Sequence, residues 1–473
     1  MKWNRTSKQA MGFFMAGALV LGSLAGCGSK TESAEQPGTA AGETGSNVEM
    51  ETVRVWTNDA SYKAVLGPIV EEYNKGQGLV DGINIDYKVF GSDYHDVLKV
   101  ALTADQGPEL YKFVGTVKEP FISAGWMVPI DDMPGGAEFL KDYEDILING
   151  YTTFEGKTYS APIKVLTTKF MYNKDLLQKS GITEAPKTWD DVVAYAKKVT
   201  EDNNGEAYGY GVHLKDSASS GKWYFAAQFA SSVGHMGYDF SSGKFRFADF
   251  TDNVEKILQM KADGSIFPGG EGMDNDTLMA QFAAGRIAML PGVNWDVSNL
   301  DKFWAELGTN FELGVCDIPV VDTANAHKNY AQIADMLCLG ASAMKMPEKA
   351  MKVYALLHGE DVQLEIQNNE VDFMARADIQ AQMPAEFKKV GTKEFGDTSN
   401  SYFTMTPPDG VITVEGADYQ STLVNLISGP LDVDVNAVLT DLDNRYNTAL
   451  ETAIKDGLDM SIYLDESWDT SAK

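Results

Sequence analysis

An alternation of strand and helix signals from residue 51 onward constrains the fold more than any other feature of this chain. Residues 52–56 (TVRVW) are largely apolar and β-branched, a helical pattern then runs to Lys75, and residues 83–89 alternate apolar and polar side chains with a period of two. Such alternation places strands in a largely parallel sheet covered by helices on both faces. The sequence therefore predicts an α/β fold, with a turn where Gly67-Pro68 interrupts the first helix.

Two later helices are marked by their end residues and their apolar faces. Thr188 can cap a helix start, and Asp191 stands three residues later in the position of a capping box. Trp189 begins the apolar face of that helix, so we expect its ring in the core and not in a binding site. A long helix is predicted from about Val435 to Lys455, where apolar residues recur at helical spacing.

The size of the chain and its cysteines bound the architecture further. The chain has 473 residues, and one hydrophobic core rarely organises more than about 250–300 residues. At least two domains or lobes are therefore expected, and an apolar content of 44% can fill them. Cys316 and Cys338 lie in apolar, strand-like runs, so two buried thiols are expected. A bridge between them is the alternative, which export from the cytoplasm would permit.

The N-terminus has the form of an export signal. Three basic residues among the first eight precede an apolar run over residues 10–24, which is shorter than the roughly 20 residues of a membrane span. The run ends in Leu-Ala-Gly-Cys at residues 24–27, which resembles a bacterial lipobox. This resemblance implies that residues 1–26 are a lipoprotein signal peptide and that Cys27 becomes diacylated, which supplies the two chains that stable anchoring requires. The alternative is an ordinary signal peptide in which Cys27 is incidental.

Residues 27–50 join this signal to the first strand. After Cys27 they are rich in Gly, Ser, Thr, Ala and Glu without apolar periodicity, which is typical of a flexible tether. Three of the 39 Lys and Arg residues lie within residues 1–26, so the mature chain keeps 36 against 68 Asp and Glu, a formal charge of −32. Nucleic acid is excluded as an expected partner, because binding it requires clustered basic residues.

Several short motifs follow one another along the mature chain in a fixed order. They are residues 107–111 (GPELY), 125–132 (GWMVPIDD), 156–162 (GKTYSAP), 171–176 (MYNKDL), 186–191 (PKTWDD), 282–289 (FAAGRIAM) and 292–295 (GVNW). In order and spacing they resemble the group 1 extracellular solute-binding proteins of bacterial ABC importers, which include maltose-binding and other sugar-binding receptors. The resemblance spans most of the mature chain. It implies a two-lobed, periplasmic-binding-protein-like (type II) fold with a ligand cleft between the lobes and closure by hinge motion.

The resemblance also implies three chain crossings between the lobes. We place them near Pro162, at residues 333–339 and at residues 404–411. The expected boundaries are residues 51–162 and 334–405 for lobe 1, and residues 163–333 and 406–473 for lobe 2. A ligand site in the cleft is expected on general grounds as well, because α/β folds place their pockets at the carboxyl ends of strands.

The function implied by the resemblance is that of a receptor without catalytic activity or cofactor. It would capture a mono- or oligosaccharide outside the cytoplasm, as a monomer held at the cell membrane by the lipid on Cys27, and deliver it to the permease subunits of an ABC importer. The alternatives are a peptide or polyol as ligand, or a secreted glycosidase, which needs only two suitably spaced carboxylates. No metal site is expected: the five His residues are scattered, and the acidic run at Asp432 and Asp434 has Ala437 where a calcium loop needs glycine.

Aromatic side chains are the first candidates for the binding site. Sugars present flat C–H faces and many hydroxyl groups, so a receptor needs exposed aromatic rings beside groups that hydrogen-bond. Trp56 ends the first strand, and Asn58 and Asp59 follow it where strand-to-helix loops point toward a cleft. Trp223 follows a Ser- and Gly-rich stretch that predicts a mobile rim of the cleft. Burial in the core is the alternative for both tryptophans.

Trp295 is the aromatic candidate that depends most on the resemblance. It follows an expected strand, and its motif is similar to a sugar-stacking position of the family. Its neighbours Asn294 and Asp296 are included in the candidate site. The tryptophans assigned a structural role are Trp126, Trp304 and Trp468.

Three charged residues complete the candidate site. Lys164 follows the first expected crossing, and Arg376 stands in the apolar-flanked run FMARAD. Asp335 interrupts the otherwise apolar second crossing, where a carboxylate is costly to bury unless a ligand hydroxyl or a backbone donor meets it. The alternative for Asp335 is a carboxylate that caps a helix or lies in a loop.

Overall fold

The computed structural model describes residues 49–113, 118–404 and 406–472, apart from the side chains of residues 335 and 336. The expected signal peptide, Cys27 and most of the expected tether lie outside these residues. Residues from Val48 onward form one compact unit. In the part that is described, no helix combines the length and the apolar character that crossing a membrane would require.

A mixed ten-stranded sheet organises the described chain in the order β2-β1-β3-β12-β6-β10-β7, with β11 and β13 also paired to β6 and β14 to β12. Its strands are β1 (Glu51–Thr57), β2 (Ile83–Val89), β3 (Leu110–Tyr111), β6 (Ser160–Asn173), β7 (Tyr208–Tyr210), β10 (Ile287–Val293), β11 (Leu313–Cys316), β12 (Asn329–Leu339), β13 (Phe373–Met374) and β14 (Ser401–Phe403). Two short hairpins stand apart from it: β4 (Thr153–Phe154) with β5 (Lys157–Thr158), and β8 (Tyr238–Asp239) with β9 (Lys244–Phe245).

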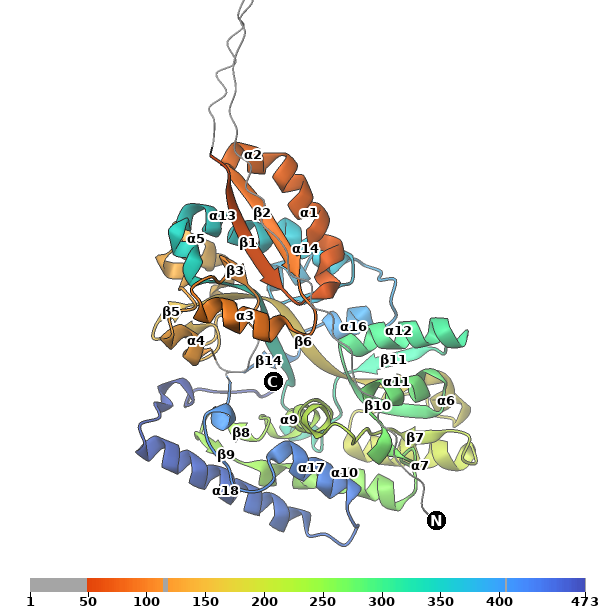
Figure 1. Ribbon diagram of the computed structural model, residues 1–473. Helices are drawn as coiled ribbons and strands as arrows, with labels where there is room; N and C mark the ends of the chain where they lie inside the picture. The colour runs from red at the N-terminus through yellow and green to blue at the C-terminus, as the bar shows by residue number, and fades with distance from the viewer. Residues whose placement is uncertain (1–48, 114–117, 405, 473) are drawn as a thin grey trace, which may run out of the picture. The chain divides into compact units, whose positions relative to one another are not determined.

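The helices alternate with these strands along the chain (Figure 1). They are α1 (Lys63–Lys75), α2 (Gln77–Asp81), α3 (Tyr94–Thr103), α4 (Glu119–Ser123), α5 (Gly136–Phe139), α6 (Lys174–Lys179), α7 (Trp189–Asp202), α8 (Ser217–Ser219), α9 (Ala227–Val233), α10 (Thr251–Ala262), α11 (Asn275–Ala283), α12 (Trp295–Leu307), α13 (Pro347–Leu357), α14 (Glu360–Asn368), α15 (Ala377–Gln380), α16 (Thr392–Gly396), α17 (Tyr419–Ser428) and α18 (Val435–Lys455). A π-helical segment, η4 (Ser220–Ala226), joins α8 to α9. The expected α/β alternation is therefore confirmed.

The long strand β6 links two regions of the sheet. Its first half pairs with β12, and its second half, from Thr168 to Asn173, pairs antiparallel with β10 and β11. The strands β1, β2, β3 and β12 form what we call the first sheet region, and β7, β10 and β11 the second. Pairing between β6 and β12 is irregular on both sides of Asp335, so the crossing strands are least regular there.

Each sheet region has its own hydrophobic core. Val53 and Val55 of β1 are fully buried, and they pack with side chains of α1, α13 and α14 against the first region. Trp189 and Phe170 are fully buried in the core that covers the second region. The interior position expected for Trp189 is thus confirmed, and so is the capping box, in which Thr188 and Asp191 exchange side-chain and backbone hydrogen bonds.

Two local expectations have clear outcomes. The prediction of a turn at Gly67-Pro68 is wrong, because α1 continues through Pro68. Gly67 has no Cβ to clash with the proline ring, and only one backbone hydrogen bond is lost while the apolar face of α1 stays buried. No disulfide joins Cys316 and Cys338, so the expectation of two thiols is confirmed. Cys338 is buried as expected, whereas Cys316 is only half-buried.

Candidate functional site

A cavity of about 580 Å³ lies next to the hairpin β8–β9 and the crossing strand β12. Cavities of roughly 300–1,000 Å³ are the usual size for small-molecule sites. Its aromatic lining consists of Tyr151, Trp223, Tyr238, Phe240, Phe245, Phe247, Trp295, Tyr330, Tyr402, Tyr419 and Trp468. Its polar lining includes Ser219, Lys222, His235, Gln332, Thr404, Thr406, Asp409 and Gln420. The cavity therefore combines large apolar faces with a few hydrogen-bonding groups.

Trp223 and Trp295 form one corner of the aromatic wall. Trp295 is the first residue of α12, directly after β10, and Trp223 lies on the π-helical segment η4. Their ring centroids are 5.4 Å apart and their planes meet at 85°. Tyr330 of β12 continues the wall at 6.0 Å from Trp223. The cavity thus brings together two tryptophans that the sequence predicts as ligand contacts.

Asp296 and Asn294 hold the chain beneath Trp295 and do not line the cavity. The carboxylate of Asp296 is fully buried and accepts hydrogen bonds from the Val293 N–H at 2.8 Å and the Tyr224 hydroxyl at 2.7 Å. Burial raises the pKa of Asp296 to about 6, although these hydrogen bonds oppose the rise. The Asn294 N–H donates to a carbonyl of β6 at 3.2 Å. Both residues therefore position the start of α12.

Lys222 and Asp409 are the oppositely charged residues of the lining. The Lys222 ammonium lies 3.3 Å from Gln332 Oε1 and 4.9 Å from the ring centroid of Trp223. Burial lowers the pKa of Lys222, and the Asp409 carboxylate opposes that change. Burial also raises the pKa of Asp409, against the effect of Lys222. Neither residue was predicted from the sequence, because neither stands out among the many charged residues of the chain.

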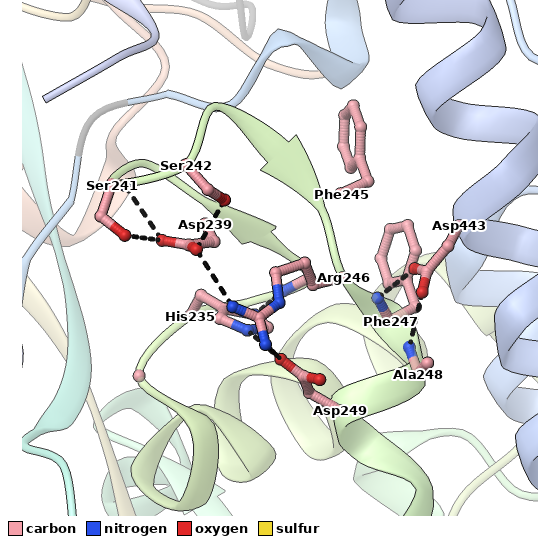
Figure 2. A network of polar contacts seen from close by, with 12 residues as sticks. His235, Asp239, Ser241, Ser242, Phe245, Arg246, Phe247, Ala248, Asp249 and Asp443 are labelled. Atoms are coloured by element: carbon pink, nitrogen blue, oxygen red, sulfur yellow. Dashed lines mark hydrogen bonds and ion pairs between the residues drawn. The ribbon is translucent and has the colours of Figure 1, made fainter. Parts of the chain in front are cut away.

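A network of ion pairs holds the hairpin that forms part of the cavity wall. Figure 2 shows Arg246 between Asp239 and Asp249, with nitrogen-to-oxygen distances of 3.4 and 2.9 Å. His235, which lines the cavity, lies 3.1 Å from Asp249 through Nε2. The carboxylate of Asp443, on α18, accepts hydrogen bonds from two backbone N–H groups that follow the hairpin, and burial raises its pKa to about 6. Asp443 thus ties the segment that follows the hairpin to α18.

The predicted residues of the first sheet region form a second polar cluster. Asp59 pairs with Lys112, and Lys164 pairs with Asp372 at 3.1 Å. The Tyr62 hydroxyl donates to Asp372 at 3.0 Å. Burial lowers the pKa of Lys164, but the nearby carboxylates outweigh burial and leave it raised. Asp59 and Lys164 therefore have partners within the protein, at the carboxyl end of β1, and neither lines the cavity.

Trp56 and Asn58 belong to the same end of β1. The Trp56 ring packs on Phe90 with centroids 4.9 Å apart and joins a small apolar cluster. Oδ1 of Asn58 is buried without a hydrogen-bond partner among the described residues, so it could accept a bond from a ligand. Neither residue lines the cavity around Trp295.

Arg376 does not line the cavity. Its guanidinium forms two hydrogen bonds to Asp378, at 3.1 and 2.6 Å, and lies 5.3 Å from the ring centroid of Tyr143. These contacts connect α15 to the core of the first sheet region. For Asp335, the backbone lies in β12 opposite Pro162, and its side chain is outside the described residues.

Two further residues bear on the sequence interpretation. Trp468, to which the sequence analysis gives a structural role, lines the cavity and packs against Phe240 at 5.4 Å. It comes from the C-terminal segment, where no local pattern marks a binding residue. Asp434 caps α18 by accepting a hydrogen bond from the Ala437 N–H at 2.9 Å, as expected for a helix start. Among the described residues, no group of three or more His, Cys, Asp or Glu could hold a metal ion.

Comparison with known proteins identifies relatives over most of the folded chain. Residues 56–363 match the family model described as bacterial extracellular solute-binding protein. A putative binding protein of Brucella abortus is 27% identical over 316 residues, which is 66% of this chain and 73% of that protein. The diacetylchitobiose binding protein DasA of Streptomyces coelicolor is 26% identical over 41% of this chain and 42% of its own length.

Solved structures agree with this match at the level of the fold. The apo form of RafE from Streptococcus pneumoniae superposes with a TM-score of 0.65 at 17% identity, covering 86% of this chain and 99% of RafE. The expected two-lobed α/β fold is thereby confirmed. Because the family model covers well over half of the sequence, the chain belongs to the bacterial extracellular solute-binding protein family.

Proposed function

We propose that the protein is the solute receptor of an ABC importer, and that it captures a mono- or oligosaccharide and delivers it to the permease subunits. The observation that carries this proposal is the corner formed by Trp223 and Trp295 in a cavity of about 580 Å³. Relatives named as binding proteins for diacetylchitobiose and for melibiose, raffinose and stachyose support a carbohydrate as the ligand.

The lining has the chemistry that a sugar requires. Two aromatic planes at a steep angle can cover both a C–H face and an edge of a pyranose ring. The ammonium of Lys222 can donate to sugar hydroxyls, and the carboxylate of Asp409 can accept from them. The Tyr402 hydroxyl is buried without a partner among the described residues, so it offers a further hydrogen bond.

The proposal includes hinge closure and no catalysis. Residues 51–162 with 334–405 would move as lobe 1 against residues 163–333 with 406–473 as lobe 2. Asn58 and Asp59 would then meet the ligand from lobe 1 and Lys164 from lobe 2, with Asp335 at the crossing. A ligand that binds the closed state more tightly shifts the population toward it, which gives a permease a difference to recognise. Among the described side chains that line the cavity, Asp409 is the one carboxylate, whereas glycoside hydrolysis generally uses a pair.

We further propose that the receptor works outside the cytoplasm, as a monomer anchored to the cell membrane through a diacylated Cys27. Membership of an extracellular solute-binding family supports an extracytoplasmic location. Mass spectrometry of the membrane fraction tests the anchor: a lipid adduct on an N-terminal Cys27 is expected, and a Cys27→Ser variant should be released in soluble form. An unmodified thiol on membrane-bound protein would contradict the anchor.

The decisive experiment is thermal unfolding of the unit from Val48 onward against sugars, amino acids, peptides and polyols. A ligand that binds only the native state stabilises it by about 2.7 kcal/mol at a hundredfold excess over the dissociation constant. A shift confined to related sugars supports the proposal. A shift with peptides or polyols alone would retain the receptor and overturn the carbohydrate assignment, and release of reducing ends would overturn the absence of catalysis.

A further inference from the structure

Lys222 and Asp409 face the same cavity from separate parts of the chain. Lys222 comes from the π-helical segment η4, and Asp409 follows Pro407 and Pro408 in the expected third crossing. Both side chains are partly buried. In the described part of the chain, no ion pair within 4.0 Å involves either of them, although many other charged residues are paired.

The two charges nevertheless act on each other through the cavity. Burial disfavours the charged form of each residue: it lowers the pKa of Lys222 and raises the pKa of Asp409. In each case the charge of the other residue opposes the shift. Burial raises the pKa of the Tyr330 and Tyr419 hydroxyls, which lie in the same wall, and the Asp409 carboxylate raises it further. Each charge therefore offsets part of the cost of burying the other, and neither is held in an ion pair with another described residue that would keep it from a third group in the cavity.

The remaining polar lining adds no free charge of its own. Gln332 accepts hydrogen bonds from both Lys222 and Tyr330, at 3.3 and 3.2 Å, and so holds the ammonium beside the aromatic wall. His235 lies against Asp249, within the network of Figure 2. The described lining therefore presents one positive and one negative group, and these balance when the cavity is empty.

We propose that this balanced pair makes the receptor specific for uncharged glycosides and excludes uronates and amino sugars of the same shape. The proposal rests on the proposed function, in which the ligand is a carbohydrate. A neutral hydroxyl can accept from Lys222 and another can donate to Asp409, so both buried charges gain partners. A uronate or an ammonium would bring a third charge into an aromatic cavity and leave one charge uncompensated, which is costly in a desolvated site.

The proposal makes opposite predictions for the two single variants. In Asp409→Asn the positive charge of Lys222 is left without its counter-charge, so a uronate should bind at least about tenfold more tightly than it binds the wild type. In Lys222→Gln the Asp409 carboxylate is left without its counter-charge, so an amino sugar should bind at least about tenfold more tightly than it binds the wild type. Affinity for the neutral sugar should fall in both variants, because each loses a charged hydrogen bond.

The test is titration calorimetry of the purified protein with matched probes, at a pH where the amine is protonated and the carboxylate ionised. The probe sets are glucose, glucuronate and glucosamine; galactose, galacturonate and galactosamine; and N,N′-diacetylchitobiose with its deacetylated form. The control variant is Lys215→Gln, because Lys215 is exposed, pairs with Asp274 and lies outside the cavity lining. It removes the same charge and should leave the selectivity unchanged.

The outcomes separate this inference from the function on which it rests. The balanced pair is supported if the wild type binds only the neutral probes, Asp409→Asn gains affinity for the uronate and Lys222→Gln gains affinity for the amino sugar. Equal wild-type affinity for a neutral sugar and its uronate or amine would overturn the inference and keep the carbohydrate receptor, as would unchanged selectivity in both variants. If the protein binds none of these sugars and none of the wider sugar panel but binds another solute, the carbohydrate function itself is overturned.

Discussion

Trp295 is the residue through which the sequence motif and the cavity meet. Replacement by alanine removes one of the two planes of the aromatic corner, while Asp296 and its hydrogen bonds remain to hold the start of α12. We expect Trp295→Ala to weaken sugar binding by more than about tenfold, because a stacking aromatic contributes roughly 1 kcal/mol or more beyond its buried area. Calorimetry measures the affinity, and thermal unfolding without ligand should change little. Trp295→Phe, which keeps a ring, should recover part of the affinity, whereas wild-type affinity of the alanine variant would exclude Trp295 from the site.

Asp296 makes a prediction about pH. Burial raises its pKa from 3.8 to about 6, so between these values the folded protein binds more protons than the unfolded chain. The free energy of unfolding should therefore fall as the pH rises through this window, by about 3 kcal/mol for this one group. In Asp296→Asn the fall should become smaller, and the remainder should come from Asp443, whose pKa is also raised to about 6, and from Asp409, whose pKa burial also raises.

Urea unfolding at several pH values measures this slope for Asp296. An unchanged slope in Asp296→Asn would show that this carboxyl titrates normally in the folded protein.

At the scale of elements, the sequence predicts most of what local patterns control. The helix α18 begins at Val435 and ends at Lys455 as its apolar spacing indicates, and the capping box at Thr188 starts α7. The failure at Gly67-Pro68 has a steric cause, since a rule for an average residue before proline does not hold for glycine. Local periodicity thus predicted the helices correctly, whereas the general rule for proline wrongly predicted a break in α1.

The hairpin β8–β9 depends on a close approach that only glycine permits. Gly237 has a φ of +101°, and a Cβ there would lie 2.1 Å from the ring of Phe247, which lines the cavity. We expect Gly237→Ala to destabilise the protein by more than about 2 kcal/mol, since the left-handed strain of roughly 1–2 kcal/mol adds to the displacement of an aromatic ring. Sugar affinity should fall with it, because the ring belongs to the cavity wall.

Gly156→Ala is the matched control for Gly237→Ala. Gly156 has a φ of +73°, but a Cβ there would meet nothing within 4 Å. It should lose only the stability that backbone strain costs, with the same sugar affinity as the wild type. Chemical unfolding and calorimetry on both variants decide the matter: equal losses would mean that the contact with Phe247 contributes nothing.

At the scale of the whole molecule, the sequence predicts the site only in part. Trp223 and Trp295 stand in recognisable runs, and the structure brings them into contact distance. Lys222, Asp409 and Trp468 join the same cavity from three separate segments, so no local pattern could reveal that they lie together. Arg376 is the opposite case: its apolar neighbours suggest a binding residue, but it forms an ion pair with Asp378, contacts the Tyr143 ring and lies outside the cavity lining. Which side chains from distant segments meet in the fold depends on tertiary packing, and the spacing of residues along the sequence does not reveal it.

Closure is the prediction that belongs to the molecule as a whole. The strand β6 runs through both sheet regions and pairs antiparallel with β12 over its first half. This pairing is interrupted on either side of Asp335, where bending disturbs the fewest hydrogen bonds. A sugar that stabilises the protein in thermal unfolding should therefore also reduce its radius of gyration in small-angle X-ray scattering, because the ligand favours the closed state. Trp295→Ala should need more sugar to reach the same reduction, since the variant changes affinity and leaves the crossing strands intact. A sugar that does not stabilise the protein is the control. If saturating ligand leaves the scattering of the wild type unchanged, the protein binds without closing, and the permease must then recognise the ligand-bound surface itself.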